Sequence, residues 1–218
     1  MELTWLGHAA VRIRSGAATL VMDPYPEELG LRIPPQQAQA SVVTISSDDP
    51  HHAAIQALEA DPAPVVINGP GEYEAGGMRI KGIRTSRYAV QGPPAWNTVY
   101  VVEVENMVLC HLGDPDRLLT AREIEELSSP HVLMLPVGSR NGLSAADAVE
   151  MVNAIAPRLV VPILFAHPGS KAELREIGPF LQELGAKRPE QQTRLSVTRA
   201  TLPEETEVGL LQAAGVLL

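Results

Sequence analysis

Short apolar runs, each bounded by glycine, proline, asparagine or aspartate, fill the first half of the chain. Their length and their content of valine and isoleucine predict β-strands. Asn106, between the last two runs, predicts a tight hairpin. The predicted strands are residues 3–6, 10–14, 18–22, 41–45, 64–68, 78–83, 98–104 and 107–112.

The second half alternates helical and extended patterns. Apolar residues at helical spacing predict helices at 118–128, 144–157 and 170–185, with Ser144 as an N-cap and Pro179 as a kink or break. The extended segments of this half are residues 131–137, 158–165, 194–200 and 207–212. The whole pattern predicts one α/β domain over residues 1–218, with two mixed sheets packed face to face and helices outside.

Composition restricts the partners and the compartment. The 218 residues carry a net charge of −9, and the 17 basic residues form no cluster, which argues against a nucleic-acid partner. No stretch approaches the roughly 20 apolar residues that span a bilayer, and the N-terminus lacks a signal-peptide pattern, so no membrane association is expected. Cys110 is the sole cysteine and lies in an apolar run, which predicts an inert core residue and a cytoplasmic protein.

The stretch SSDDPHH, residues 46–52, follows the predicted strand 41–45. It places carboxylates and imidazoles at the exit of a strand, and both groups bind divalent metals such as zinc and manganese. The hydroxyl and acidic residues also suit the N-terminus of a helix predicted over 51–60. A metal loop and a capped helix are both consistent with these residues.

Several stretches, in this order along the chain, resemble the metallo-β-lactamase superfamily. They are TWLGHAAVRI, VMDPY, VVTISSDDPHH, GPGEYEAGGMRIKGI, NTVYVVEVENMVLCHLGD, LMLPVG and RLVVPILF. The resemblance is to the branch typified by ascorbate-6-phosphate lactonase and described as zinc-dependent hydrolase-like, and it runs from Met1 to about Leu211. It implies a four-layer αββα sandwich whose loops hold one or two divalent metals. In that family the metal lowers the pKa of a bound water and polarises the scissile bond.

The resemblance gives each position of the 46–52 loop a role. With Ser46 at the leading serine of the family motif, the first ligand histidine falls on Ser47 and the last one on His52. Asp49 and His51 stand at the two ligand positions between them. Of these four ligand positions, only His52 carries the residue that the family motif has.

The resemblance also assigns the ligands outside this loop. The bridging aspartate is Asp114, the final histidine falls on Leu164, and the segment 84–88 has no histidine where a further ligand is expected. A metal site is thus expected to be degraded, with no cofactor bound; the alternative is one Zn or Mn ion. The candidate residual ligands are His51, His52, Asp114 and Asp49, and the lost ligand positions are Ser47 and Leu164.

Five further residues are candidates for the cleft or for supporting the ligands. In the family, His8 lies near the site and Asp23 supports a ligand, although here each could instead be structural, Asp23 by holding a turn. His111 could reach the cleft and His167 could replace the lost ligand. Glu72 could project into the cleft, although a solvated loop acid is the preferred interpretation.

Three functions follow from the resemblance and from the changed ligands. The first is a hydrolase-like protein without dinuclear metal hydrolysis that is kept for binding or scaffolding. The second is a hydrolase with a repurposed mononuclear site that acts on a small lactone, ester or phosphorylated metabolite. The third is a subunit of a homo-oligomer. Whether the chain is an enzyme, and whether its partner is a small molecule or a protein, stay open.

Overall fold

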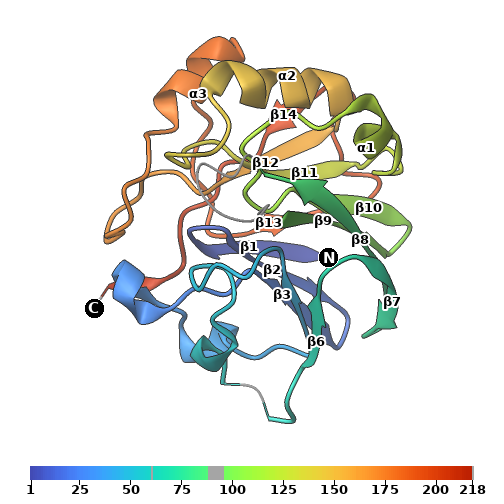
Figure 1. Cartoon of the computed structure of the whole chain (residues 1–218), viewed down its shortest axis with the longest axis vertical. Helices are drawn as coiled ribbons and strands as arrows, with labels where there is room; N and C mark the ends of the chain where they lie inside the picture. The colour runs from blue at the N-terminus through green and yellow to red at the C-terminus, as the bar shows by residue number, and fades with distance from the viewer. Residues whose placement is uncertain (60, 88–95, 218) are drawn as a thin grey trace.

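Two β-sheets packed face to face form the centre of the computed structural model, which describes residues 1–59, 61–87 and 96–217 (Figure 1). In the first sheet, β1 to β3 are antiparallel neighbours, and β3, β5 and β6 run parallel. The spatial order is β13 (Leu195–Ser196), β1 (Glu2–Gly7), β2 (Ala10–Ser15), β3 (Ala18–Met22), β5 (Val42–Ile45) and β6 (Val65–Asn68).

The second sheet is also mixed. Strands β7 to β10 are antiparallel neighbours, whereas β10, β11, β12 and β14 run parallel. The spatial order is β14 (Glu207–Val208), β12 (Leu159–Ile163), β11 (Val132–Pro136), β10 (Met107–His111), β9 (Trp96–Val104), β8 (Met78–Ser86) and β7 (Gly71–Ala75). A separate two-strand ribbon pairs β4 (Leu31–Arg32) with β15 (Val216–Leu217).

The outer layers of the sandwich differ between the two sheets. The α-helices lie on the side of the second sheet (Figure 1); they are α1 (Ala121–Glu125), α2 (Ala145–Ile155) and α3 (Gly178–Glu183). The outer face of the first sheet packs instead against loops and 3₁₀ turns, which are η1 (Glu27–Leu29), η2 (Pro35–Gln37) and η3 (Ile55–Ala57). The predicted sandwich of two mixed sheets is confirmed, and its layer over the first sheet is built from short turns.

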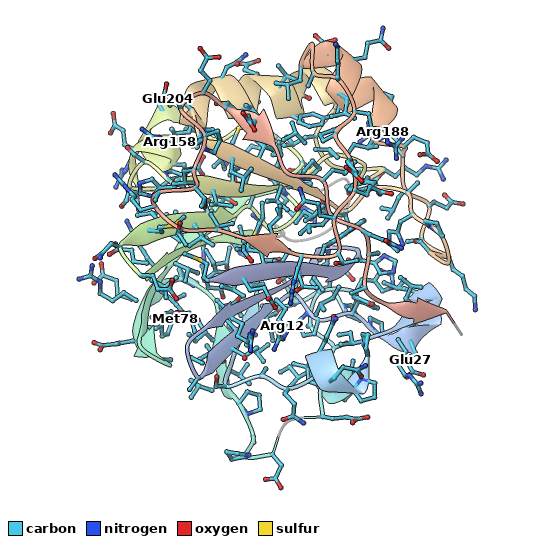
Figure 2. All side chains as sticks on the ribbon, turned by 180° about the vertical axis from the view of Figure 1, so that it is seen from behind. Arg12, Glu27, Met78, Arg158, Arg188 and Glu204 are labelled. Atoms are coloured by element: carbon cyan, nitrogen blue, oxygen red, sulfur yellow. The ribbon has the colours of Figure 1, made fainter. Side chains whose placement is uncertain are left out.

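Apolar side chains from both sheets form the core between them. Trp5 of β1, Val102 of β9 and Leu133 of β11 are fully buried in one cluster, which Met151 of α2 joins from the helical side. Side chains fill this space, and Met78, labelled in Figure 2, is fully buried at the start of β8. Burial of such side chains supplies most of the free energy that favours folding.

Two local predictions are confirmed. Glu105 and Asn106 both have positive φ, 51° and 59°, as a tight turn between two antiparallel strands requires. Cys110 is buried in the core, and burial raises the pKa of its thiol.

Within the described chain, no helix combines the length and the apolar character that crossing a membrane would require.

The prediction of a helix over residues 51–60 is wrong. The described part of this segment holds turns and the 3₁₀ helix η3. The backbone N–H of Ala54 donates to the carbonyl of Pro24, in the loop after β3, at 2.9 Å. An N–H used in this way cannot bond to the carbonyl four residues earlier, so a remote acceptor replaces the α-helical pattern.

The helix predicted over 170–185 is confirmed only in its last third, α3. Lys171 donates its backbone N–H to the carbonyl of Leu29, and Arg175 donates to that of Gly138. Pro179 therefore lies in the first turn of a short helix and does not kink a longer one. This position suits proline, because an N–H in the first turn has no helical partner.

Helix α2 provides a test of the capping interpretation of Ser144. The Ser144 hydroxyl accepts a hydrogen bond from the Asp147 N–H at 3.1 Å, and the Asp147 carboxylate accepts from the Ser144 N–H at 3.2 Å. We predict that Ser144→Ala lowers the free energy of unfolding by about 1 kcal/mol, since two helix N-terminal bonds are lost or weakened. Urea denaturation measures the change. Ser144→Thr keeps a capping hydroxyl that can also donate to Asp147, as Ser144 does at 2.7 Å, and should stay close to wild type; equal losses in both variants would contradict the assignment.

Candidate functional site

A cleft lies where strands of both sheets end. The loops after β5, β10, β11 and β12 each contribute residues to it, and the turn between β1 and β2 contributes His8. Its volume is about 190 Å³. The lining residues are His8, Leu29, Asp49, His51, His52, Arg87, Asp114, Ser139, Arg140, Asn141, Leu164, Ala172, Glu173 and Leu174. The carboxyl ends of parallel strands are where α/β sheets commonly place their ligand sites.

The fully buried carboxylate of Asp23 organises one wall of this cleft. One of its oxygens accepts the Ser46 backbone N–H at 2.8 Å, and the other accepts the Ser46 hydroxyl at 2.6 Å. The second oxygen also lies 3.0 Å from Nδ1 of His52. Asp23 thus fixes both ends of the 46–52 loop, and it has a positive φ of 47°, which aspartate tolerates better than most residues.

Asp23 and His52 form a buried hydrogen-bonded pair whose pKa values are shifted in opposite directions. Burial alone raises the pKa of the Asp23 carboxyl, but its hydrogen bond to His52 and the nearby histidine charges bring that pKa below its ordinary value. Burial alone lowers the pKa of His52, but the hydrogen bond to Asp23 and the charges of Asp23, Asp114 and Asp49 bring it above 6.5. Nδ1 of His52 therefore donates to the carboxylate.

The carboxylate of Asp114 forms the opposite wall. The Ser139 hydroxyl donates to its Oδ2 at 3.1 Å, and Nη2 of Arg87 lies 3.4 Å from the same oxygen. Its Oδ1 is buried and has no hydrogen-bond partner in the part of the chain that the structure describes. The Asn97 side chain accepts the Asp114 N–H at 3.0 Å and so fixes the backbone of this loop.

His8 lies at the base of the cleft, only 1% exposed. Its ring packs edge-on to Tyr25 and His167, at centroid distances of 4.7 Å and 5.0 Å. Neither ring nitrogen makes a hydrogen bond of normal geometry within the described chain. Burial, together with the neighbouring histidines, lowers the pKa of His8 to about 3, and the nearby Leu29 backbone offsets this only in part. The ring is neutral at physiological pH.

The sequence matches an established family. The sequence profile of the β-lactamase superfamily domain matches residues 2–164. The chain belongs to this superfamily.

Individual relatives agree with this assignment. A UPF0173 metal-dependent hydrolase of Archaeoglobus fulgidus is 25% identical over 191 residues, which cover 75% of this chain and 82% of that protein. Another, from Methanoculleus marisnigri, is 25% identical and covers 96% of this chain and 97% of its own length. Both relatives are similar to this chain over most of its length.

Solved structures show the same fold. A metallo-β-lactamase superfamily protein of Thermotoga maritima has a TM-score of 0.78 and 27% identity, covering 97% of this chain and 98% of that one. Igni18, a metallo hydrolase of Ignicoccus hospitalis, has a TM-score of 0.67 and 17% identity, covering 100% and 97%. The second likeness concerns the fold alone.

The superfamily's ligand positions are not all brought together. His51, His52, Asp49 and Asp114 do line one cleft. His51, however, is half exposed at the mouth of the cleft, where its ring lies 3.6 Å from Asp49 and 3.7 Å from Glu28. Among the described residues, no three His, Cys, Asp or Glu side chains form a group that could hold a metal ion. Metal ligation by these four residues stays a prediction.

The two lost ligand positions have separate surroundings. Leu164 lines the cleft directly after β12 and has a positive φ of 53°, which is rare for leucine. Ser47 lines a different hollow, together with Arg84 and Trp96. An apolar side chain thus lines the cleft at the position where the resemblance implies a final histidine, and that position stays a prediction.

The remaining candidates have structural surroundings. Nε2 of His111 lies 2.9 Å from the Ala9 carbonyl and its Nδ1 accepts the Gly113 N–H, so both ring nitrogens are used. Nε2 of His167 accepts the backbone N–H of His8 at 3.3 Å. The prediction that Glu72 projects into the cleft is wrong, because Glu72 is exposed on β7 and lines a separate hollow with Arg79 and Lys81.

Arg87 was missed by reasoning from the sequence. It follows β8, in the segment where the resemblance implies a further ligand histidine, and the structure places its guanidinium against Asp114. An arginine in a polar stretch is common at solvent-exposed positions, so no local pattern distinguishes this one. The one signal in the sequence was that residues 84–88 contain no histidine where the resemblance implies a ligand.

The first prediction for the site concerns Asp23. We predict that Asp23→Asn lowers the pKa of His52 and lowers the free energy of unfolding by about 2–3 kcal/mol, because the buried imidazole loses its counter-charge. Histidine NMR titration and urea denaturation measure the two effects. Asp48→Asn, an exposed change in the same loop, should stay within about 0.5 kcal/mol of wild type. An unchanged His52 titration in Asp23→Asn would contradict the pairing.

The second prediction concerns His8 and pH. Since the folded protein holds the pKa of His8 near 3 and the unfolded chain has the ordinary value near 6.5, the unfolded state binds the extra proton between these values. The stabilisation is complete above about pH 6.5 and is lost as pH falls, by about 1.4 kcal/mol per pH unit from this group. His8→Asn should show a shallower acid dependence in urea denaturation, since asparagine tolerates a positive φ and does not titrate. Identical slopes would contradict the prediction.

Proposed function

We propose that this protein binds a small polar molecule in the cleft and does not carry out the two-metal hydrolysis of its superfamily. The observation that carries the proposal is Leu164, whose apolar side chain lines the cleft at the position of the superfamily's last ligand histidine. A hydrocarbon side chain supplies no lone pair to a metal. Without this histidine the site lacks one coordinating side chain, and metal catalysis depends on the number and geometry of the ligands.

The other donors do not compensate for this loss. His52 and Asp114 keep the superfamily's residue types, but the Asp114 Oδ2 already accepts from Ser139 and faces Arg87. Asp49 accepts the backbone N–H of His51 at 2.9 Å, which directs this carboxylate to its own loop. A stable zinc site needs three or four well-placed ligands. The donor set therefore does not fit a two-metal centre.

The cleft retains features that suit a small molecule. Leu29, Leu164 and Leu174 supply an apolar wall, and Ser139 and Asn141 supply hydroxyl and amide groups. Small-molecule sites combine these two kinds of surface, the first for affinity and the second for orientation. A volume of about 190 Å³ suits a molecule of metabolite size.

A hydrolase with one metal is the second candidate function. It would use His52 and Asp114 with His51 or Asp49 and act on a small lactone, ester or phosphorylated metabolite. That all four residues line one cleft favours this candidate, as does the description of the relatives as metal-dependent hydrolases.

Elemental analysis of the untagged protein separates the two functions. After dialysis, and again after loading with zinc or manganese, we expect less than roughly a tenth of an equivalent of bound metal, because too few donors converge. Lactones and phosphoesters should show no turnover with the loaded protein. Near one equivalent in the wild type, lost in a His52→Ala, Asp114→Ala double variant, would contradict the proposal and establish the one-metal site.

A further inference from the structure

We infer that Arg87 supplies, from within the chain, the positive charge that a metal supplies to the bridging aspartate in the superfamily, and that this arginine keeps divalent cations from Asp114. The inference rests on the proposed function, since it explains how the cleft stays stable without a metal. It assigns a specific role to a residue that has no counterpart among the superfamily's ligands.

The contacts of Arg87 support this role. Its Nη2 lies 3.4 Å from Asp114 Oδ2, and its Nε lies 3.9 Å from Asp116 Oδ2. The three side chains are only 18%, 12% and 11% exposed, so solvent screens them weakly. A guanidinium within 4 Å of two carboxylates in a partly buried site stabilises their charged forms. The Arg87 guanidinium is close enough to stabilise the negative charge of both Asp114 and Asp116.

The surroundings of the two Asp114 carboxylate oxygens also support this role of Arg87. Its Oδ2 accepts from the Ser139 hydroxyl and faces Arg87. Its Oδ1 is buried against the backbone of Gly142, where an added Cβ would come within 2.9 Å of it. Oδ2 is thus engaged by neighbouring side chains, and Oδ1 is shielded from solvent. A metal would have to displace the guanidinium and would be repelled by its permanent charge.

The end of β8 is held close enough for Arg87 to make these contacts. Arg117, one residue beyond Asp116, donates from Nε to the carbonyl of Ser86 at 3.0 Å and to the Ser86 hydroxyl at 3.2 Å. Ser86 directly precedes Arg87. The loop after β10 is therefore tied to the end of β8, and the position of Arg87 is built into the fold.

The test compares Arg87→Gln with a matched control, Arg84→Gln, near the end of β8, the strand that Arg87 follows. Arg84 is exposed and its guanidinium lies 4.8 Å from the Trp96 ring centroid. We expect Arg87→Gln to lower the thermal midpoint by roughly 5 °C, because it removes the positive charge beside the Asp114 carboxylate. Calorimetry with manganese chloride and with zinc chloride should show saturable binding to Arg87→Gln, and each salt should raise its midpoint. Wild type and Arg84→Gln should show neither response.

A second variant keeps the inference testable if Arg87→Gln does not fold. Adding Asp114→Asn to Arg87→Gln removes one uncompensated carboxylate, so the double variant should fold, regain stability and show no divalent-cation response. Failure of the double variant to recover any stability would overturn the inference.

The outcomes also separate this inference from the proposed function. Near one equivalent of metal in the wild type would overturn both. A metal-free wild type, together with an Arg87→Gln variant that neither loses stability nor gains divalent binding, would overturn the role of Arg87 and leave the proposed function standing.

Discussion

The buried carboxylate of Asp23 joins segments that lie far apart in the chain. It follows β3, and it accepts hydrogen bonds from the start and the end of the loop after β5, through Ser46 and His52. A carboxylate buried in this way would be strongly destabilising without partners, so its bonds and the opposite charge of His52 are required together. The wall of the cleft, and the direction in which His52 faces, depend on this one group.

The cleft contains two buried acidic groups, each with a basic side chain beside it. Nδ1 of His52 lies 3.0 Å from Asp23, and the Arg87 guanidinium lies within 4 Å of Asp114 and of Asp116. A guanidinium keeps its positive charge at every physiological pH, so it stabilises the carboxylates beside it whatever the cleft binds.

One residue of the cleft has a backbone conformation that its side chain does not favour. Leu164 keeps a positive φ at the end of β12, although leucine gains nothing from that conformation. Neighbouring hydrogen bonds maintain this conformation. The Leu164 N–H donates to the carbonyl of His8, and the His8 N–H donates in turn to Nε2 of His167. These backbone hydrogen bonds hold Leu164 in its positive-φ conformation whatever side chain it carries.

Local patterns in the sequence determined the strands, the hairpin at Asn106, the cap at Ser144 and the burial of Cys110, because strand periodicity, turn propensity and capping act over a few residues. Order and spacing of motifs along the chain determined the superfamily and several cleft residues. Tertiary structure alone decided that Ala54 and Arg175 use remote carbonyls in place of helical ones, that Glu72 faces a different hollow, and that Arg87 meets Asp114. These outcomes depend on which groups become neighbours once the two sheets pack, and a local pattern contains no information about a partner tens of residues away.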